Sequence, residues 1–288
     1  MNNLKKTWFD YFLVLFFVFI LLITLYPFLN VLAISMNDAT DTLKNINFVI
    51  PRKFTLANYK YVFEEADIIG PLFMSIAKTV IGTLVGVVCT SMLAYTLSRR
   101  DFVFHKSFTL LFVITMYVGG GMIPEYLLIM RNLHLGNKFI VYLLPGLIWV
   151  YNMILVRSYI DGLPIALQEA AKLDGANDFQ IWYKVIMPLC TPVIATIALY
   201  CAVGQWNSFM DTYLYAKELP TLQYKLYEIM SQATMQLDTH STNNATQAVT
   251  PMAIRMAVTV VATVPIIVVY PFVQKYFVGG MTLGSVKD

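Results

Sequence analysis

Charge is what this sequence has least of. Only 13% of its 288 residues are charged and 58% are hydrophobic, whereas soluble globular domains carry roughly 25% charged residues. The formal net charge of +3 is small and scattered along the chain, so it provides no basic surface of the kind that binds nucleic acid. The composition therefore excludes an ordinary soluble domain and a nucleic-acid-binding protein.

Motifs that carry enzyme chemistry are also missing. The sequence has no Gly-x-x-x-x-Gly-Lys-Ser/Thr loop to cradle phosphates, and neither His-Glu-x-x-His nor Gly-x-Ser-x-Gly occurs. Its three cysteines, Cys89, Cys190 and Cys201, have no metal-ligand spacing and are interpreted as small apolar packing residues. We expect this chain to be no enzyme and to bind no metal or cofactor itself.

Long uncharged runs dominate what remains. A bilayer core about 30 Å thick is spanned by ~20 apolar residues in a helix. Six windows of at least 18 residues contain no Asp, Glu, Lys or Arg, namely 11–37, 79–98, 107–124, 139–156, 185–210 and 256–274. The sequence thus predicts an all-α membrane protein with a six-helix transmembrane domain over residues 11–276. A secondary transporter or channel acting alone is disfavoured, because such proteins place ionisable residues inside their spans.

The orientation of the spans follows from the positions of lysine and arginine. With the N-terminus in the cytoplasm, the inner segments hold ten of these residues and the outer segments nine. The basic clusters at 5–6 and 99–106 favour both termini inside. The predicted cytoplasmic parts are then residues 1–10, the turn 99–106, the loop 157–188 and the tail 277–288, and the long outer loops are 38–70 and 211–255.

Two glycine patterns interrupt the predicted helices. Gly119-Gly120-Gly121 followed by Pro124 should break the end of the third helix, because glycine weakens a helix and proline removes a hydrogen-bond donor. We expect a bent or re-entrant segment there. Gly82 and Gly86 in the second window either permit close helix approach or are ordinary membrane-helix glycines.

The loop 157–188 has the most specific pattern in the chain. Pro164 suits the first turn of a helix, and good helix formers follow as far as Asp174-Gly175, where glycine tolerates a left-handed cap. Asn177 or Asp178 can cap a second helix, in which apolar residues recur at spacings of three and four: Phe179, Trp182, Tyr183 and Ile186. The loop therefore predicts two short helices joined by a sharp turn, forming a compact knob on the membrane surface.

This loop closely resembles the signature loop of binding-protein-dependent ABC importer permeases. That signature is Glu-Ala-Ala, three residues, Gly, nine residues and Ile-x-Leu-Pro; here it is Glu169-Ala170-Ala171, Gly175 and Val185-Ile186-Met187-Pro188, with Val and Met as departures. Its place between the fourth and fifth spans also matches. A bare Glu-Ala-Ala tripeptide would mean little, and the full spacing carries the resemblance.

The resemblance extends over residues 11–286 and is strongest to the smaller permease of maltose-type sugar importers. Residues 119–128 and 202–209 look like the branch associated with complex oligosaccharides and alginate-like sugars. The ending 279–288 resembles the family's glycine-rich tail, with Asp288 where glycine is common. The coupling loop is shared across the family, so a permease for a non-sugar solute stays open.

The resemblance implies a type I importer permease in a bacterial cell membrane, with cytoplasmic coupling helices. Its partners would be a second homologous permease, a dimer of ATP-binding cassette ATPases that uses ATP and Mg, and an extracytoplasmic sugar-binding protein. The coupling loop would dock on the ATPase through Glu169, Ala170, Ala171, Asp174, Gly175, Ala176 and Pro188.

A path for the sugar is also suggested by the sequence. Aromatic faces with a few hydrogen-bonding groups suit a sugar, and the fourth and fifth windows supply Trp149, Asn152, Thr196, Tyr200, Trp206 and Asn207. The alternative is that these residues are interfacial aromatics and interhelical hydrogen-bonding groups.

Overall fold

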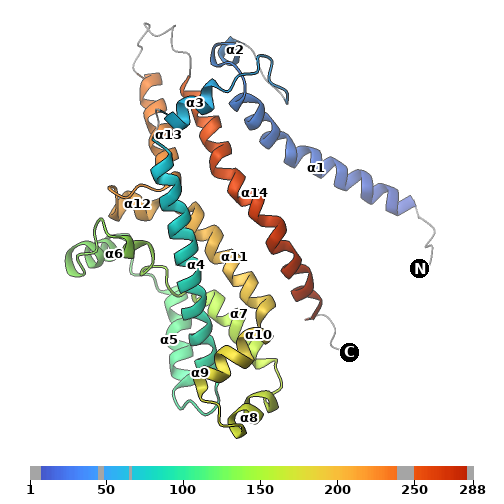
Figure 1. Ribbon diagram of the computed structural model, residues 1–288, viewed down its shortest axis with the longest axis vertical. Coiled ribbons are helices and arrows are strands. Elements are labelled where there is room, and N and C mark those ends of the chain that lie inside the picture. The colour runs from blue at the N-terminus through green and yellow to red at the C-terminus, as the bar shows by residue number, and fades with distance from the viewer. Residues whose placement is uncertain (1–7, 45–48, 65–66, 239–249, 284–288) are drawn as a thin grey trace. The chain divides into compact units, whose positions relative to one another are not determined.

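A computed structural model describes residues 8–44, 49–64, 67–238 and 250–283. Most of the described residues are helical, and their one β-type pairing is an isolated bridge between Asn37 and Phe54, so the predicted all-α class is confirmed. Figure 1 labels the α-helices, and the elements in chain order are α1 (Trp8–Ser35), α2 (Ala39–Lys44), α3 (Ala57–Glu64), α4 (Ile69–Ser98), α5 (His105–Tyr117), α6 (Met122–Leu127), η1 (Leu128–Asn132), η2 (Phe139–Tyr142), α7 (Val150–Asp161), α8 (Ala166–Leu173), α9 (Asp178–Gln180), η3 (Ile181–Ile186), α10 (Met187–Leu189), α11 (Thr191–Asn207), α12 (Met210–Tyr215), α13 (Leu222–Asp238) and α14 (Pro251–Leu283).

The chain divides into two compact units. The first comprises residues 1–69 with 225–265, and the second comprises 70–224 with 266–288. In the first unit, the chain that leaves α1 is held by asparagine side chains. Asn58 donates to the carbonyl oxygens of Ser35 and Asn37 at 2.9 and 3.0 Å. These bonds satisfy two backbone carbonyl groups that accept no hydrogen bond within a helix.

The second unit contains the packed helices that position the candidate site. Gly82 and Gly86 of α4 lie where α4 approaches other segments closely. A Cβ at Gly82 would lie 3.0 Å from the side chain of Gln205 in α11, and one at Gly86 would lie 3.6 Å from the carbonyl oxygen of Leu147. The close-approach interpretation of these two glycines is therefore the one the structure supports.

Three helices of the described chain are long and apolar enough to cross a membrane: Trp8–Ser35, Ile69–Ser98 and Pro251–Pro271. Two further pairs of helices meet this criterion only as bent pairs, which gives up to five spans. The class of apolar helical membrane protein is thus supported, whereas the predicted count of six spans is not confirmed.

The predicted break after the third span is confirmed. α5 ends at Tyr117, and α6 and η1 continue after a bend of 111°. Gly121 at the start of α6 has φ of +86°, a conformation that side-chain-bearing residues rarely adopt. Pro124 lies in the first helical turn that follows, where a missing N–H costs little.

The fourth window, 139–156, differs from the prediction. Its only long helix is α7, which has 12 residues and begins at Val150, and the short 3₁₀ helix η2 precedes an irregular stretch over 143–149. Pro145 and Gly146 fall in that stretch, and both disfavour helix. Hydropathy alone does not detect such an interruption, which explains why the window resembled a full span.

Candidate functional site

The loop 157–188 forms the two helices that its sequence predicts. α8 is followed by Gly175, whose φ of +80° lies in the left-handed region. Asn177, rather than Asp178, caps the second helix: its side chain accepts from the backbone N–H of Gln180 at 2.9 Å, and the Gln180 side chain accepts from the Asn177 N–H at 3.0 Å. This reciprocal pair is a capping box. We call residues 164–186 the knob.

The second helix of the knob is not a uniform α-helix. Residues 181–186 form a π-helical segment, which inserts an extra residue into the turn. Trp182 and Ile186 are buried, whereas Phe179 and Tyr183 are 60% and 63% exposed. The expected single apolar face is therefore split between the core and the surface, because the wider turn changes the angular spacing of the side chains.

The predicted coupling residues lie on two sides of the knob. Glu169, Ala170, Asp174, Gly175 and Pro188 are exposed. Ala171 and Ala176 are half-buried and pack against the chain's own core cluster. The small size of these two alanines therefore serves packing within this chain, and Ala170 is the alanine that faces outward.

Charged groups tie the knob to the turn between α4 and α5. Arg99 donates to Asp178 at 2.7 Å and to the hydroxyl of Tyr95 at 2.8 Å, and it also pairs with Asp101. Lys172 donates at 2.9 Å to Asp101 Oδ2, an oxygen that also accepts from Arg99. Both helices of the knob are thus bonded to one turn. We call these four charged residues (99, 101, 172, 178) the clamp.

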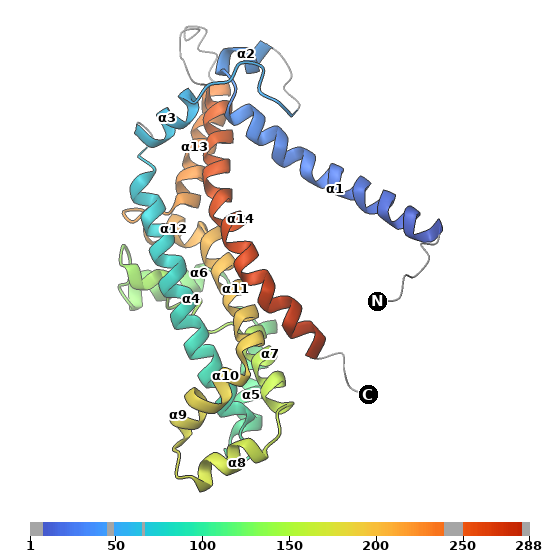
Figure 2. The ribbon, with the colours of Figure 1, turned by 45° about the vertical axis from the view of Figure 1, so that its right-hand side comes forward.

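Electrostatics reinforce the clamp. Hydrogen bonds from Arg99 and then Lys172 hold the pKa of Asp101 well below its usual range. The bond to Asp101 in turn raises the pKa of Arg99 above its ordinary value. Both groups therefore stay charged at neutral pH. Figures 1 and 2 show α8 and α9 gathered at the C-terminal end of α4, where the clamp lies.

A cavity of about 710 Å³ lies between the knob and this turn. Glu169 lines it, together with charged residues of both signs: Arg99, Arg100, Asp101, Arg157, Asp161 and Lys172. No ion pair of Glu169 occurs among the described residues. Its carboxylate is available to a partner.

The residues predicted for a sugar path are not gathered in one place. Trp149 lines a second cavity of about 340 Å³. Asn152 is fully buried beside the Cys201 thiol, Thr196 bonds to the carbonyl of Pro192, and Trp206 is buried. Tyr200 and Asn207 are exposed. Of the six, Trp149 alone lines this second cavity.

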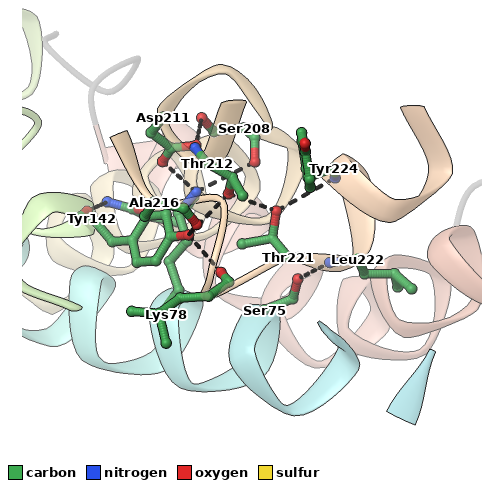
Figure 3. A network of polar contacts seen from close by, with 12 residues as sticks. Ser75, Lys78, Tyr142, Ser208, Asp211, Thr212, Ala216, Thr221, Leu222 and Tyr224 are labelled. Carbon is green, nitrogen blue, oxygen red and sulfur yellow. Dashed lines mark hydrogen bonds and ion pairs between the residues drawn. The ribbon is translucent and has the colours of Figure 1, made fainter. Parts of the chain in front are cut away.

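A polar network adjoins that cavity and supplies three of its lining residues, Tyr142, Ser208 and Asp211 (Figure 3). Lys78 of α4 has no exposed side-chain surface and forms an ion pair of 2.5 Å with Asp211. Tyr142 donates to the carbonyl oxygen of Leu219 at 2.7 Å and shares a hydrogen bond with Thr212. In the sequence, Lys78 directly precedes the uncharged window 79–98 and Asp211 directly follows the window 185–210. No local pattern predicts that residues so far apart form a pair.

No three His, Cys, Asp or Glu side chains in the described ranges lie together in a way that could hold a metal ion. The chain combines long apolar helices with a charged, exposed helix pair at one end of a unit. These features are those of a helical membrane protein with a polar surface at one end of that unit.

Residues 3–283 match the family described as "Binding-protein-dependent transport system inner membrane component", and the chain belongs to that family. Members of this family are membrane components of transport systems rather than enzymes.

Relatives cover nearly the whole chain. A polygalacturonan/rhamnogalacturonan transport system permease protein, YtcP of Bacillus subtilis, is 36% identical over 99% of this chain and 100% of its own length. Protein LplC of the same organism is 38% identical over 92% of this chain and 90% of its own. A solved bacterial ABC transporter involved in import of the acidic polysaccharide alginate has a chain that is 28% identical, with a TM-score of 0.77, covering 96% of this chain and 100% of that one.

Proposed function

We propose that this chain is the transmembrane permease subunit of an ATP-driven ABC importer that translocates an oligosaccharide. The match to the transport family over residues 3–283 carries this proposal. The sugar cargo is supported by the names of several relatives, whose transport systems take polygalacturonan/rhamnogalacturonan or arabinooligosaccharides. A permease for a non-sugar solute has no comparable support.

The topology we propose is that of a type I importer permease with six spans and both termini in the cytoplasm of a bacterial cell. The fourth window would cross as α7 with its irregular preceding segment. Non-helical backbone at that depth is tolerated only where it lies against protein or water, so residues 143–149 would line the translocation path or the second permease.

The knob is proposed as the site that receives the ATPase. Leu173, Phe179 and Tyr183 are exposed by 90%, 60% and 63%, and exposed apolar groups on a charged surface are typical of a docking site. Glu169 would meet a basic group of the ATPase. Gly175 has no atom within 4 Å of its Cβ position, so an approaching partner can lie close to the backbone there.

The clamp would transmit the motion of the ATPases to the spans. Since Asp178 and Lys172 bond to the α4–α5 turn at 2.7 and 2.9 Å, a displacement of the knob pulls on both of these helices. ATP binding would close the ATPase pair and shift the permeases between inward-open and outward-open states. Each ligand shifts that equilibrium only by its differential affinity for the two states.

The remaining partners follow from this mechanism. ATP and Mg would be used by a dimer of separate ATPase subunits. A second homologous permease would complete the path, and an extracytoplasmic binding protein would deliver the sugar. The outer loop 211–255, part of which lies outside the described residues, is the proposed contact for that protein. The tail over 284–288 also lies outside the described residues.

A pull-down in mild detergent tests the proposal. We expect this chain to co-purify with a second permease and an ATPase whose activity rises with one sugar-loaded binding protein. A chain that purifies alone and moves solute without ATP would contradict the proposal and favour a secondary transporter.

A further inference from the structure

The cavity beside Trp149 has an aromatic wall that is held in place. Trp149 is 39% exposed and lines the cavity together with Gly204 and Gln205 of α11. A Cβ at Gly204 would lie 2.5 Å from the Trp149 ring, so the ring lies directly against the glycine backbone. A fixed, partly exposed indole face is a suitable surface for the C–H face of a sugar ring.

The Asp211 carboxylate, which also lines the cavity, already has hydrogen-bond and ion-pair partners within the chain (Figure 3). One oxygen of Asp211 accepts from the Ser208 hydroxyl at 2.9 Å and the Thr212 N–H at 3.0 Å, and the other pairs with Lys78. The negative charge of Asp211 is thus compensated by Lys78, which does not itself line the cavity. This arrangement presents an ordered, overall neutral surface to the cavity.

Glu125 is the uncompensated charge of the cavity. It belongs to the first turn of α6, lines the cavity and is exposed. It forms no ion pair among the described residues, and none of the residues that line the cavity is Lys, Arg or His. The cavity therefore faces its occupant with one net negative charge and no cation that could pair with a carboxylate.

We propose that this cavity binds an uncharged sugar ring of the oligosaccharide, and that Glu125 makes the site reject a uronate at that position. A carboxylate accepts hydrogen bonds from sugar hydroxyls strongly, and the Gln205 amide can add a further donor or acceptor. A uronate placed there would bring a second carboxylate close to Glu125 with no cation of the cavity lining between them, and like charges at short range repel. The inference rests on the proposed oligosaccharide transport and adds the charge class of one bound ring.

Binding of two matched sugars tests this inference. The probes are a galacturonate tetrasaccharide and its carboxyl-reduced, uncharged counterpart, added to the complete permease–ATPase complex in detergent without binding protein. Saturation-transfer NMR gives the affinity for each. We expect the wild type to prefer the uncharged sugar, and Glu125→Gln to reduce that preference about tenfold. Equal affinities in the wild type, no binding of either sugar, or an unchanged preference in Glu125→Gln would each overturn the inference.

Two further variants separate binding from folding. Glu218→Gln makes the same chemical change at an exposed site outside the cavity and should leave the preference unchanged. Trp149→Ala should weaken both sugars about equally, and Trp149→Tyr should restore part of the affinity. ATP-driven uptake by the wild-type importer in proteoliposomes is measured separately. Its absence would refute the proposed function, whereas uptake with unaltered selectivity in Glu125→Gln would refute only this inference.

Discussion

Gly175 occupies a backbone conformation that few other residues would accept. With φ at +80°, a side chain there costs about 1 kcal/mol or more for most residues, whereas Asn and Asp tolerate the left-handed region better. The position is exposed and open. The glycine is thus favoured by the turn and, in the proposed mechanism, required by the close approach of the ATPase.

Gly175→Asp should uncouple ATP hydrolysis from transport while the chain still inserts in the membrane. Asp fits the turn, so the expected loss arises from a side chain and a charge at the docking surface. ATPase stimulation by the loaded binding protein is the measurement. Gly175→Asn, of nearly equal size, is the matched comparison that separates charge from bulk. Normal ATP-driven uptake in Gly175→Asp would count against the docking role.

Glu169→Lys should likewise weaken attachment of the ATPase, because it reverses the charge of an exposed carboxylate that no described residue pairs. We expect at least a tenfold loss of transport, the effect of about 1.4 kcal/mol, with Glu169→Gln less affected. Co-purification of the ATPase measures attachment directly. Full recovery of the ATPase with Glu169→Lys would exclude this residue from the contact.

At the scale of elements, the clamp connects the knob to α4 and α5. Arg99→Ala should lower the number of sugars transported per ATP hydrolysed, because Asp178 and Asp101 lose their shared partner. Arg100→Ala is the matched control, since Arg100 is the adjacent arginine, is exposed and forms no ion pair among the described residues. Both variants are compared for uptake and ATPase activity in the same vesicles. An unchanged ratio in Arg99→Ala would show that the clamp only stabilises the fold.

The ion pair of Lys78 and Asp211 joins α4 to the segment that follows α11. Lys78→Met should destabilise the second unit by up to about 3 kcal/mol, because it leaves the Asp211 carboxylate without its cation in a largely buried place. Lys78→Met combined with Asp211→Asn should recover part of that loss, since the uncompensated charge is gone. Thermal unfolding of the detergent-solubilised complex measures both. A double variant no more stable than the single one would contradict the charge explanation.

At the scale of the whole molecule, the proposed function requires subunits in addition to this chain. It has no phosphate-binding loop in its sequence, yet it belongs to a family of transport components. In the proposed mechanism, its exposed knob is the surface on which the ATPase docks. Removal of ATP from the assembled importer should therefore abolish uptake without dissociating this chain from the second permease, as uptake and size-exclusion measurements would show.

Features governed by neighbours in sequence could be predicted from the sequence alone. The long uncharged runs predicted the helical membrane class, the three glycines predicted the bend after α5, and local backbone chemistry predicted the Gly175 turn. It also narrowed the helix cap to Asn177 or Asp178, of which the structure has Asn177. The spacing of the signature loop also gave the family, which the match over residues 3–283 confirms. Each of these depends on interactions within a few turns of helix.

Only the tertiary structure decided what distant segments do together. Arg99 and Asp178 are 79 residues apart, and Lys78 and Asp211 are 133 apart, so their pairing depends on how the helices pack. The irregular stretch over 143–149 and the π-helical segment of the knob likewise interrupt patterns that looked continuous. Local periodicity determines which residues form helices, but the cavity beside Trp149 exists because Gly204, Glu125 and Asp211 are brought together by packing.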